Sequence, residues 1–421
     1  MNNKLSNYDN KLPGSILTDL DFFLKYIQEN DLILSGKKAS FPSKSLSDVN
    51  KGMAHSLKLI FNRPTLSSYP HISGIFLLSL TLRLIHLVPN KSKSNLVVNK
   101  EVYNNWIKLN STEKYFTLIN VWLYYSDEKI VSISSRNYNS DVLTHILDFF
   151  KRVGKKLIID KVDEPLYYHI YPVTIVKLAL LEMFGFIEIT DSLKSKLNRW
   201  QVNKISITEF ATEMNKLFLS LIKKSIHESK GSELFIKKLK ESFPSFNNFL
   251  LPEVKKTNKG AFIFKVSLSK FLWRKIKIKG TNDMGLFANA ILEAFNLDND
   301  HLYDFSYTTS NGILIKLYHY AININDFFDD SGCFYADETL VGDLDINIGD
   351  NLTFLNDYGS SWYFDIKLET IEDLSNLDHP MVIESFGEDP EEYPNEDEDE
   401  DEDEDSEEYI DEDENDFIKI R

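Results

Sequence analysis

The 421-residue chain contains one cysteine, no long apolar run and none of the common phosphate or nucleophile motifs. Because Cys333 is the single cysteine, a disulfide framework and a cysteine-based zinc site are excluded. The most apolar stretch, residues 72–88, contains Arg83 and His86 and is too short to span a bilayer. A Gly-rich phosphate loop, a serine nucleophile elbow and a His-x-x-x-His pair are all missing. We therefore expect no cofactor, no metal centre and no membrane span.

The chain opens with MNNKLSNYDNKLPG, which is too polar for a signal peptide. Together with the lone cysteine, this favours a cytoplasmic location.

Charge is distributed unevenly along the chain. Residues 1–250 hold 34 basic and 23 acidic side chains, whereas residues 251–387 hold 11 basic and 21 acidic ones. Residues 388–416 add 21 acidic side chains and no basic one. A segment of like charges repels itself and has too little to bury, so residues 388–421 are predicted to be a disordered acidic tail.

A repeated pattern runs through the basic N-terminal part, after an amphipathic helix expected over residues 16–28. Each unit has a helix, a loop, an apolar helix, two short strands and a capped helix. In the first unit the two leading helices are expected over about residues 47–61 and 72–86, and Asn99 caps the last one. In the second unit they are expected over 141–153 and 174–184, and Thr208 is the cap.

This order resembles the winged-helix plan of DNA-binding regulators, at the level of pattern only. The resemblance implies that lysines and arginines beside the wings contact phosphates. The candidate nucleic-acid-binding residues are Lys91, Lys93, Lys194, Lys196, Arg199 and Lys204. However, the helices at the recognition position are apolar nearly all round, as buried helices are, so a scaffold without base readout is the competing interpretation.

The acidic part from residue 260 alternates strand patterns with one helix. Short alternating runs precede Gly280, and a helix is expected over residues 284–295 with Asp283 near its start. Two hairpins follow, one turning at Asn311-Gly312 and the other at Asp357-Tyr358-Gly359-Ser360. These patterns predict an antiparallel α+β domain with one main helix.

Motifs in this domain resemble the plasmid pRi-type open-reading-frame-three-like family, which also occurs as a transposon passenger protein. The positions that carry the resemblance are Trp273, Arg274, Ile276, His301, Leu302, Phe305, Asp337, Glu338, Asp357, Tyr358, Gly359, Trp362 and Glu369. The resemblance implies an α+β fold and a link to mobile elements, but no reaction. The chain departs from the family at Ser360, where an acid is usual, and at Phe364, where a histidine is usual. The family's closing segment is shortened to Gly387-Glu388-Asp389-Pro390.

Several polar residues of this domain could also carry chemistry. His301 with Asp304 could be a general base and the group that orients it, or a structural histidine. Carboxylates that could gather a divalent cation, or simply face solvent, are Asp326, Asp329, Asp330, Asp337 and Glu338. Asp357 could cap its own turn, and Trp273 and Trp362 could be core residues or a ligand-facing wall.

We expect a multidomain α+β protein with a mainly helical, winged-helix-like N-terminal part. The expected divisions are residues 1–45, 46–137, 138–246, a linker at 247–259, 260–387 and the tail 388–421. The leading hypothesis is a binding or adaptor protein with a protein partner, linked to mobile elements and not catalytic. Its binding-surface candidates are Trp273, Arg274, His301, Asp337, Glu338, Asp357 and Trp362. The alternatives are nucleic-acid binding by the N-terminal units and a metal-dependent hydrolase built on His301, Asp337, Glu338 and Asp357.

Overall fold

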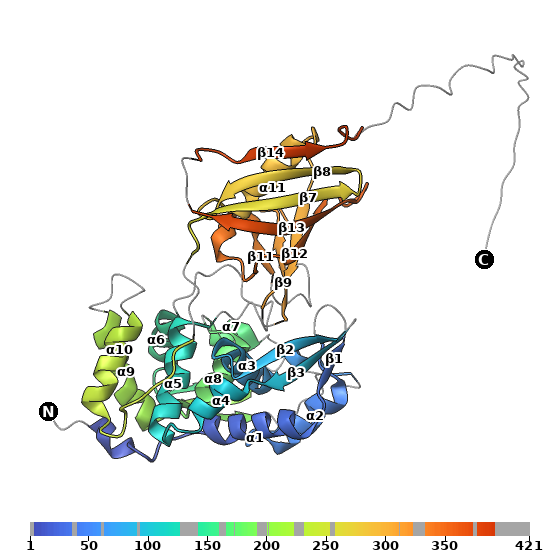
Figure 1. Cartoon of the computed structure of the whole chain (residues 1–421). Helices are drawn as coiled ribbons and strands as arrows, with labels where there is room; N and C mark the ends of the chain where they lie inside the picture. Colours follow the sequence, from blue (N-terminus) through green and yellow to red (C-terminus); the bar gives the residue numbers. More distant parts are fainter. Residues whose placement is uncertain are drawn as a thin grey trace, which may run out of the picture.

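In the computed structural model, a C-terminal sheet domain stands on a mainly helical N-terminal part (Figure 1). The structure describes residues 4–35, 40–59, 63–90, 93–126, 142–159, 166–171, 173–191, 200, 202–222, 231–252, 257–310, 312–322, 333–373 and 377–391. The expected α+β class is confirmed. None of the described helices is both long enough and apolar enough to cross a membrane.

The first N-terminal unit contains a three-stranded sheet and three helices. Its elements are α1 (Ile16–Glu29), β1 (Ile33–Ser35), α2 (Ser43–Gly52), α3 (Pro70–Thr81), β2 (Ile85–Asn90) and β3 (Lys93–Val98). The sheet order is β1-β3-β2, with antiparallel pairs throughout. Since β1 pairs with β3, the segment before residue 46 belongs to the same sheet as the residues after it.

The second unit has the same order of elements. They are α6 (Val142–Val153), β4 (Lys156–Ile158), α7 (Leu166–Ile170), α8 (Ile175–Met183), β5 (Ile187–Asp191) and β6 (Val202–Ile207). Its sheet order, β4-β6-β5, corresponds strand for strand to that of the first unit.

Four more helices flank the two units: α4 (Lys100–Trp106), α5 (Ser111–Tyr124), α9 (Glu209–Ile222) and α10 (Gly231–Ser242). Asn99 caps α4 through the N–H groups of Glu101 and Val102, as expected. Thr208 accepts the Ala211 N–H at the start of α9. Short 3₁₀ turns occur at Lys4–Tyr8 and Leu66–Ser68.

Three helix boundaries differ from those expected. The helix expected over 47–61 is α2, which ends at Gly52, where the Asn50 side chain bonds both backbone groups of Leu57 and turns the chain. The helix expected over 72–86 ends at Thr81, because Arg83 takes a positive φ of 56°. The Lys-rich amphipathic pattern over residues 222–243 also predicts a helix. In the structure this helix is α10 (Gly231–Ser242), and residues 223–230 lie outside the described part.

The residues expected to begin a linker are attached to α5. The backbone N–H groups of Asn247 and Asn248 donate to Glu113, and that of Leu250 donates to Thr117. The chain is therefore held against the N-terminal part up to Leu250.

The described residues of the C-terminal domain form an eight-stranded sheet with one α-helix. Its strands are β7 (Ala261–Ser269), β8 (Leu272–Lys279), β9 (Tyr303–Thr308), β10 (Leu314–Tyr318), β11 (Cys333–Tyr335), β12 (Asn351–Asn356), β13 (Trp362–Glu372) and β14 (Met381–Phe386). The sheet order is β11-β10-β9-β12-β13-β7-β8-β14, and among these described strands only the β10–β11 pair is parallel. Helix α11 (Met284–Ala294) begins at Asp283, whose side chain accepts the Leu286 N–H. Short 3₁₀ turns follow at Ala336–Glu338 and Val341–Asp343.

Each part has its own hydrophobic core. One core spans Leu5 to Phe246, and the other spans Phe262 to Leu368. The β9–β10 hairpin joins the two parts, since Ile313 packs against both cores. A Cβ on Gly312 would lie 2.5 Å from that of Leu87 on β2. The hairpin tip therefore lies directly against the sheet of the first unit.

Candidate binding surfaces

Helices α3 and α8, at the recognition positions of the two units, pack against each other inside the N-terminal part. Gly74 on α3 allows this approach, because a Cβ there would lie 2.9 Å from the Leu180 side chain on α8. Every α3 residue from Pro70 to Leu80 is buried, and so is every α8 residue from Val176 to Met183. In the described units, these two helices present no exposed polar face for reading bases.

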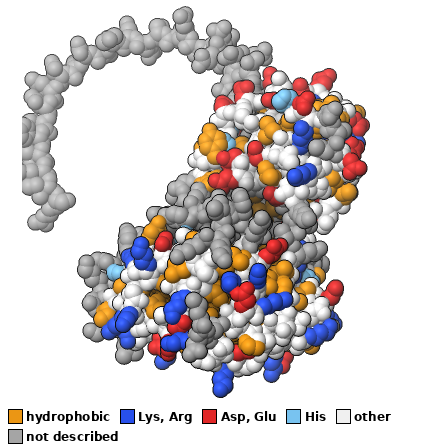
Figure 2. Space-filling model, turned by 90° about the vertical axis from the view of Figure 1, so that its left-hand side faces the viewer, with side chains coloured by type: hydrophobic (Ala, Val, Ile, Leu, Met, Phe, Trp, Pro, Cys, Tyr) orange, Lys and Arg blue, Asp and Glu red, His pale blue; other side chains and the backbone are white. Residues whose placement is uncertain are grey.

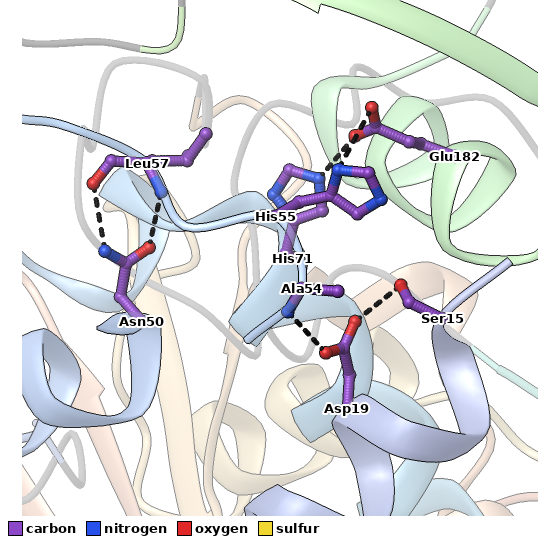
Figure 3. A network of polar contacts seen from close by, with 8 residues as sticks. All are labelled: Ser15, Asp19, Asn50, Ala54, His55, Leu57, His71 and Glu182. Atoms are coloured by element: carbon purple, nitrogen blue, oxygen red, sulfur yellow. Dashed lines mark hydrogen bonds and ion pairs between the residues drawn. The ribbon is translucent and has the colours of Figure 1, made fainter. Parts of the chain in front are cut away.

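A polar network crosses this interface (Figure 3). Nε2 of His71 on α3 lies 2.8 Å from Oε2 of Glu182 on α8, with both side chains buried. Nδ1 of His55 lies 3.5 Å from the other Glu182 oxygen, and the two imidazoles stack. The Trp200 ring lies 4.7 Å from that of His71. The network therefore joins the two units through buried polar side chains.

The chain leading into α3 is fixed by a second group of bonds in the same view (Figure 3). Asp19 on α1 accepts the Ala54 backbone N–H at 2.8 Å and the Ser15 hydroxyl at 2.6 Å. These bonds place His55 beside Glu182, so we assign this cluster a structural function in joining the units.

The nucleic-acid candidates are only partly described. Lys91, Lys194, Lys196 and Arg199 lie outside the described residues. Lys93 is exposed at the start of β3 and pairs in register with Asn90. Lys204 is half-buried within β6, opposite Thr190 on one side and Ile158 on the other. Lys93 is thus at the hairpin tip, whereas Lys204 is inside its sheet.

In the C-terminal domain, Trp273 lies on the sheet face opposite α11. Its ring stacks on that of Phe386 from β14, with centroids 5.9 Å apart. The Lys265 ammonium lies 4.3 Å from the Trp273 centroid, close enough for a cation–π contact. Lys275 beside it pairs with Glu369 and Glu384.

Arg274, the next residue, points to the other side and is buried. Its guanidinium donates to the carbonyls of Ala294 at the end of α11 and Phe386 at the end of β14. It also bonds Asp389 and lies over the Phe295 ring. Arg274 therefore ties three segments together, and its guanidinium is engaged within the protein.

The turn of the second hairpin places Asp357 near His301. Nδ1 of His301 is 3.8 Å from Oδ1 of Asp357, and Nε2 is 3.4 Å from Asp300. The pKa of Asp357 is lowered chiefly by the Gly359 backbone N–H and also by Ser360. Asp357 thus caps its own turn at a positive φ of 55°. Asp304 accepts the Tyr358 hydroxyl.

Asp337 and Glu338 are exposed in the 3₁₀ turn before the Asp283–Leu340 bridge. The charge of Asp337 acts on Tyr303, whose pKa burial and that charge raise to about 12. Burial lowers the pKa of His319, and Asp337 partly opposes this. Asp337 therefore lies near Tyr303 and His319, whereas Asp357 lies near His301.

The described residues do not support the metal-site hypothesis. Among them, no three His, Cys, Asp or Glu side chains are placed to hold an ion. Asp326, Asp329 and Asp330 lie outside the described part.

The two departures from the family pattern have clear positions. Phe364 is fully buried, with its ring against those of Phe295 and Phe354. The Ser360 backbone N–H donates to Asp357 in the turn. Trp362 is half-buried against the same core.

Sequence reasoning missed two features of this domain. One is β14, whose six residues are all exposed. The other is Asn356, which is fully buried at the end of β12, with neither amide atom bonded to any described group. The run Met381-Val382-Ile383 after Pro380 was a signal for a strand, although it does not alternate.

A family model agrees with the resemblance of the C-terminal part. Residues 261–407 match the model of a family described as "Plasmid pRiA4b ORF-3-like protein", about a third of the chain. The crystal structure of a protein of unknown function from Methanosarcina mazei Go1 is similar at 15% identity and a TM-score of 0.25. That match covers 30% of this chain and 68% of the other. No curated protein matches the chain.

Proposed function

We propose that this chain is a binding or adaptor protein whose N-terminal part is a scaffold and whose C-terminal sheet domain presents the binding surface. The observation that carries the proposal is the mutual burial of α3 and α8, joined by the His71–Glu182 bond. A link to mobile elements is part of the proposal and rests on the description of the matched family.

In this proposed function, the N-terminal units are tandem winged-helix-like units. Two features support this: the element order helix, strand, helix, helix, strand, strand, and the placing of the last strand in the middle of each sheet. We place the start of the first unit at α1, ahead of residue 46, because β1 completes its sheet. The helix that reads bases in DNA-binding members of this plan is buried in both units, which favours a scaffold.

The C-terminal domain supports binding more than catalysis. A general base needs a reacting partner within hydrogen-bond reach. The His301 ring lies 3.4 Å from Asp300 and 3.8 Å from the turn-capping Asp357, while Asp337 lies by Tyr303 and His319. The candidate side chains of the hydrolase hypothesis therefore divide between two places.

Affinity capture tests the adaptor function. The full-length chain is immobilised and exposed to lysate of the source cells, with and without nuclease, and bound proteins are identified by mass spectrometry. We expect a reproducible set of proteins that survives nuclease treatment. Capture of nucleic acid with proteins that disappear on nuclease treatment would contradict the proposal.

Nucleic-acid binding through the wings is the second candidate function. It is favoured by the basic excess of residues 1–250 and by exposed Lys93 at the tip of the β2–β3 hairpin. Figure 2 shows Lys and Arg gathered on the N-terminal part and acidic side chains on the C-terminal domain in that view.

A gel shift with duplex DNA at two salt concentrations tests this candidate. The full chain is compared with a chain ending at Glu391, which keeps the Asp389 contact to Arg274. If the acidic tail competes with DNA, the shortened chain binds more tightly, and its affinity falls steeply with salt. Unchanged, undetectable binding by both chains would exclude the candidate.

A further inference from the structure

The edge strand β14 is an exposed apolar strand. Its residues Met381, Val382, Ile383 and Phe386 are 43–52% exposed, and Phe271 in the neighbouring β7–β8 turn is 76% exposed. One side of β14 pairs with β8, and no described strand pairs with the other side. An unpaired apolar edge is a template for another strand unless charge, proline or covering elements protect it.

This edge is fixed in place, not loosely attached. Arg274 bonds the Phe386 carbonyl and Asp389, and Trp273 stacks on the Phe386 ring. Lys275 binds Glu384 at 2.8 Å. A strand held at both its middle and its end is already in the conformation that strand addition requires, which lowers the entropy cost of binding.

The position of β14 leaves its edge accessible. It lies at the side of the sheet farthest from the N-terminal part, whereas the β9–β10 hairpin tip lies against that part (Figure 1). A partner could therefore pair with β14 without displacing either unit.

The charges around the edge select the kind of partner. The exposed carboxylates along it are Asp378, Glu384, Glu388, Asp389 and Glu391. Glu384 is paired with Lys275 and Asp389 with Arg274, so the charge offered to a partner comes from Asp378, Glu388 and Glu391. Over residues 377–391, His379 is the only side chain that could carry a positive charge. A complementary segment therefore carries Lys or Arg.

A second copy of the chain fits this edge poorly. A second β14 strand would bring the same carboxylates, Asp378, Glu388 and Glu391, against this edge, and like charges opposed across strands are destabilising.

We propose that the free edge of β14 binds an extended segment of a partner protein in which apolar and basic side chains alternate, adding a ninth strand to the sheet. This inference rests on the proposed binding function and names the chemistry of its partner. The main-chain bonds supply affinity, and apolar contacts with Phe386 and Met381 and the surrounding carboxylates supply selectivity.

The test uses the full-length chain and a fluorescein-labelled ten-residue peptide of alternating Val and Lys, followed by anisotropy. Two control peptides are alternating Val and Glu, and the Val–Lys peptide N-methylated at every residue. We expect the Val–Lys peptide to bind at least about tenfold more tightly than either control. Equal binding of the N-methylated peptide would show charge attraction without strand pairing and would overturn the proposal.

Variants locate the site. Replacing Val382, Ile383 and Phe386 together by Thr should weaken Val–Lys peptide binding at least about tenfold. The control variant Tyr320→Thr should not weaken it, because Tyr320 is 69% exposed and follows β10, near the opposite edge of the sheet. The pair Glu388→Lys and Glu391→Lys should shift preference towards the Val–Glu peptide. Circular dichroism confirms that each variant is folded. Unchanged binding by the folded triple variant would overturn the proposal.

Sedimentation and affinity capture separate the remaining outcomes. A wild-type dimer that the triple variant cannot form would assign the edge to a second copy and overturn the proposal. If the triple variant still captures the nuclease-resistant proteins, the edge proposal fails and the adaptor function stands. If the wild-type chain captures none, the adaptor function itself fails.

Discussion

Gly185, just after α8, lies so close to Gly14, just before α1, that a Cβ on Gly185 would be 2.8 Å from the Gly14 backbone nitrogen. The Ser15 N–H also donates to the Met183 carbonyl at 2.8 Å. The end of the second unit's buried helix thus lies against the entrance to the first unit.

Replacing Gly185 by alanine should destabilise the protein by more than the left-handed backbone alone explains. Gly185 has a φ of 67°, and Gly154 has a similar φ of 63° with no atom within 4 Å of an added Cβ. We expect Gly154→Ala to cost about 1 kcal/mol and Gly185→Ala clearly more. Urea unfolding measures both, and equal losses would contradict the close approach.

Glu182→Gln should weaken the junction between the units. The substitution removes the buried carboxylate that contacts buried His71 and partly exposed His55, and we expect a loss of about 1–3 kcal/mol in the free energy of unfolding. The matched control is Glu29→Gln, which breaks an exposed pair with Lys25 and should cost less than about 0.5 kcal/mol. Similar small effects in both variants would argue against a structural function for the network.

Asn356→Leu should stabilise the protein. The Asn356 amide is fully buried, with no hydrogen-bond partner in the described part of the chain, and an unbonded buried amide costs about 1–3 kcal/mol. Asn50 is the control, because its buried amide bonds Leu57 at both backbone groups. We expect a higher melting temperature for Asn356→Leu and a lower one for Asn50→Leu. A drop in both would indicate that Asn356 is hydrogen-bonded in solution.

Glu113 should link stability to acid pH. Burial raises the pKa of its carboxyl, but N–H donors from Asn110, Asn248 and Asn247 outweigh burial, so the folded-state pKa is lowered. The resulting stability is present above the unfolded-state pKa and is lost as pH falls through the folded-state value. Wild type should therefore exceed Glu113→Gln in unfolding free energy at neutral pH, and the gap should close below about pH 4. A gap independent of pH would contradict this assignment.

Local signals predicted most of the C-terminal domain. Asp283 marked the start of α11, and the period-two runs on either side of Gly312 and Gly359 marked both hairpins. In each case the residues that decide the structure are neighbours in sequence.

What the sequence could not indicate depends on contacts between distant segments. The parallel β10–β11 pair and the joining of β1 to β3 both require segments that are far apart or only three residues long. Arg83 ends α3 at a positive φ, where Gly185 ends α8, and no local pattern marks an arginine for that conformation. For the candidate site, Arg274 was named as a binding-surface candidate, but it is buried, and its engagement with Phe386 and Asp389 depends on the unexpected strand β14.

The packing of α3 on α8 has a consequence for synthesis on the ribosome. Helix α3 emerges first, with apolar side chains on every side, and its cover is translated only when α8 follows. Until then the nascent chain exposes an apolar surface that binds chaperones or neighbouring chains. A product that terminates before residue 175 would keep that surface uncovered permanently, so such fragments should aggregate more readily than the whole chain.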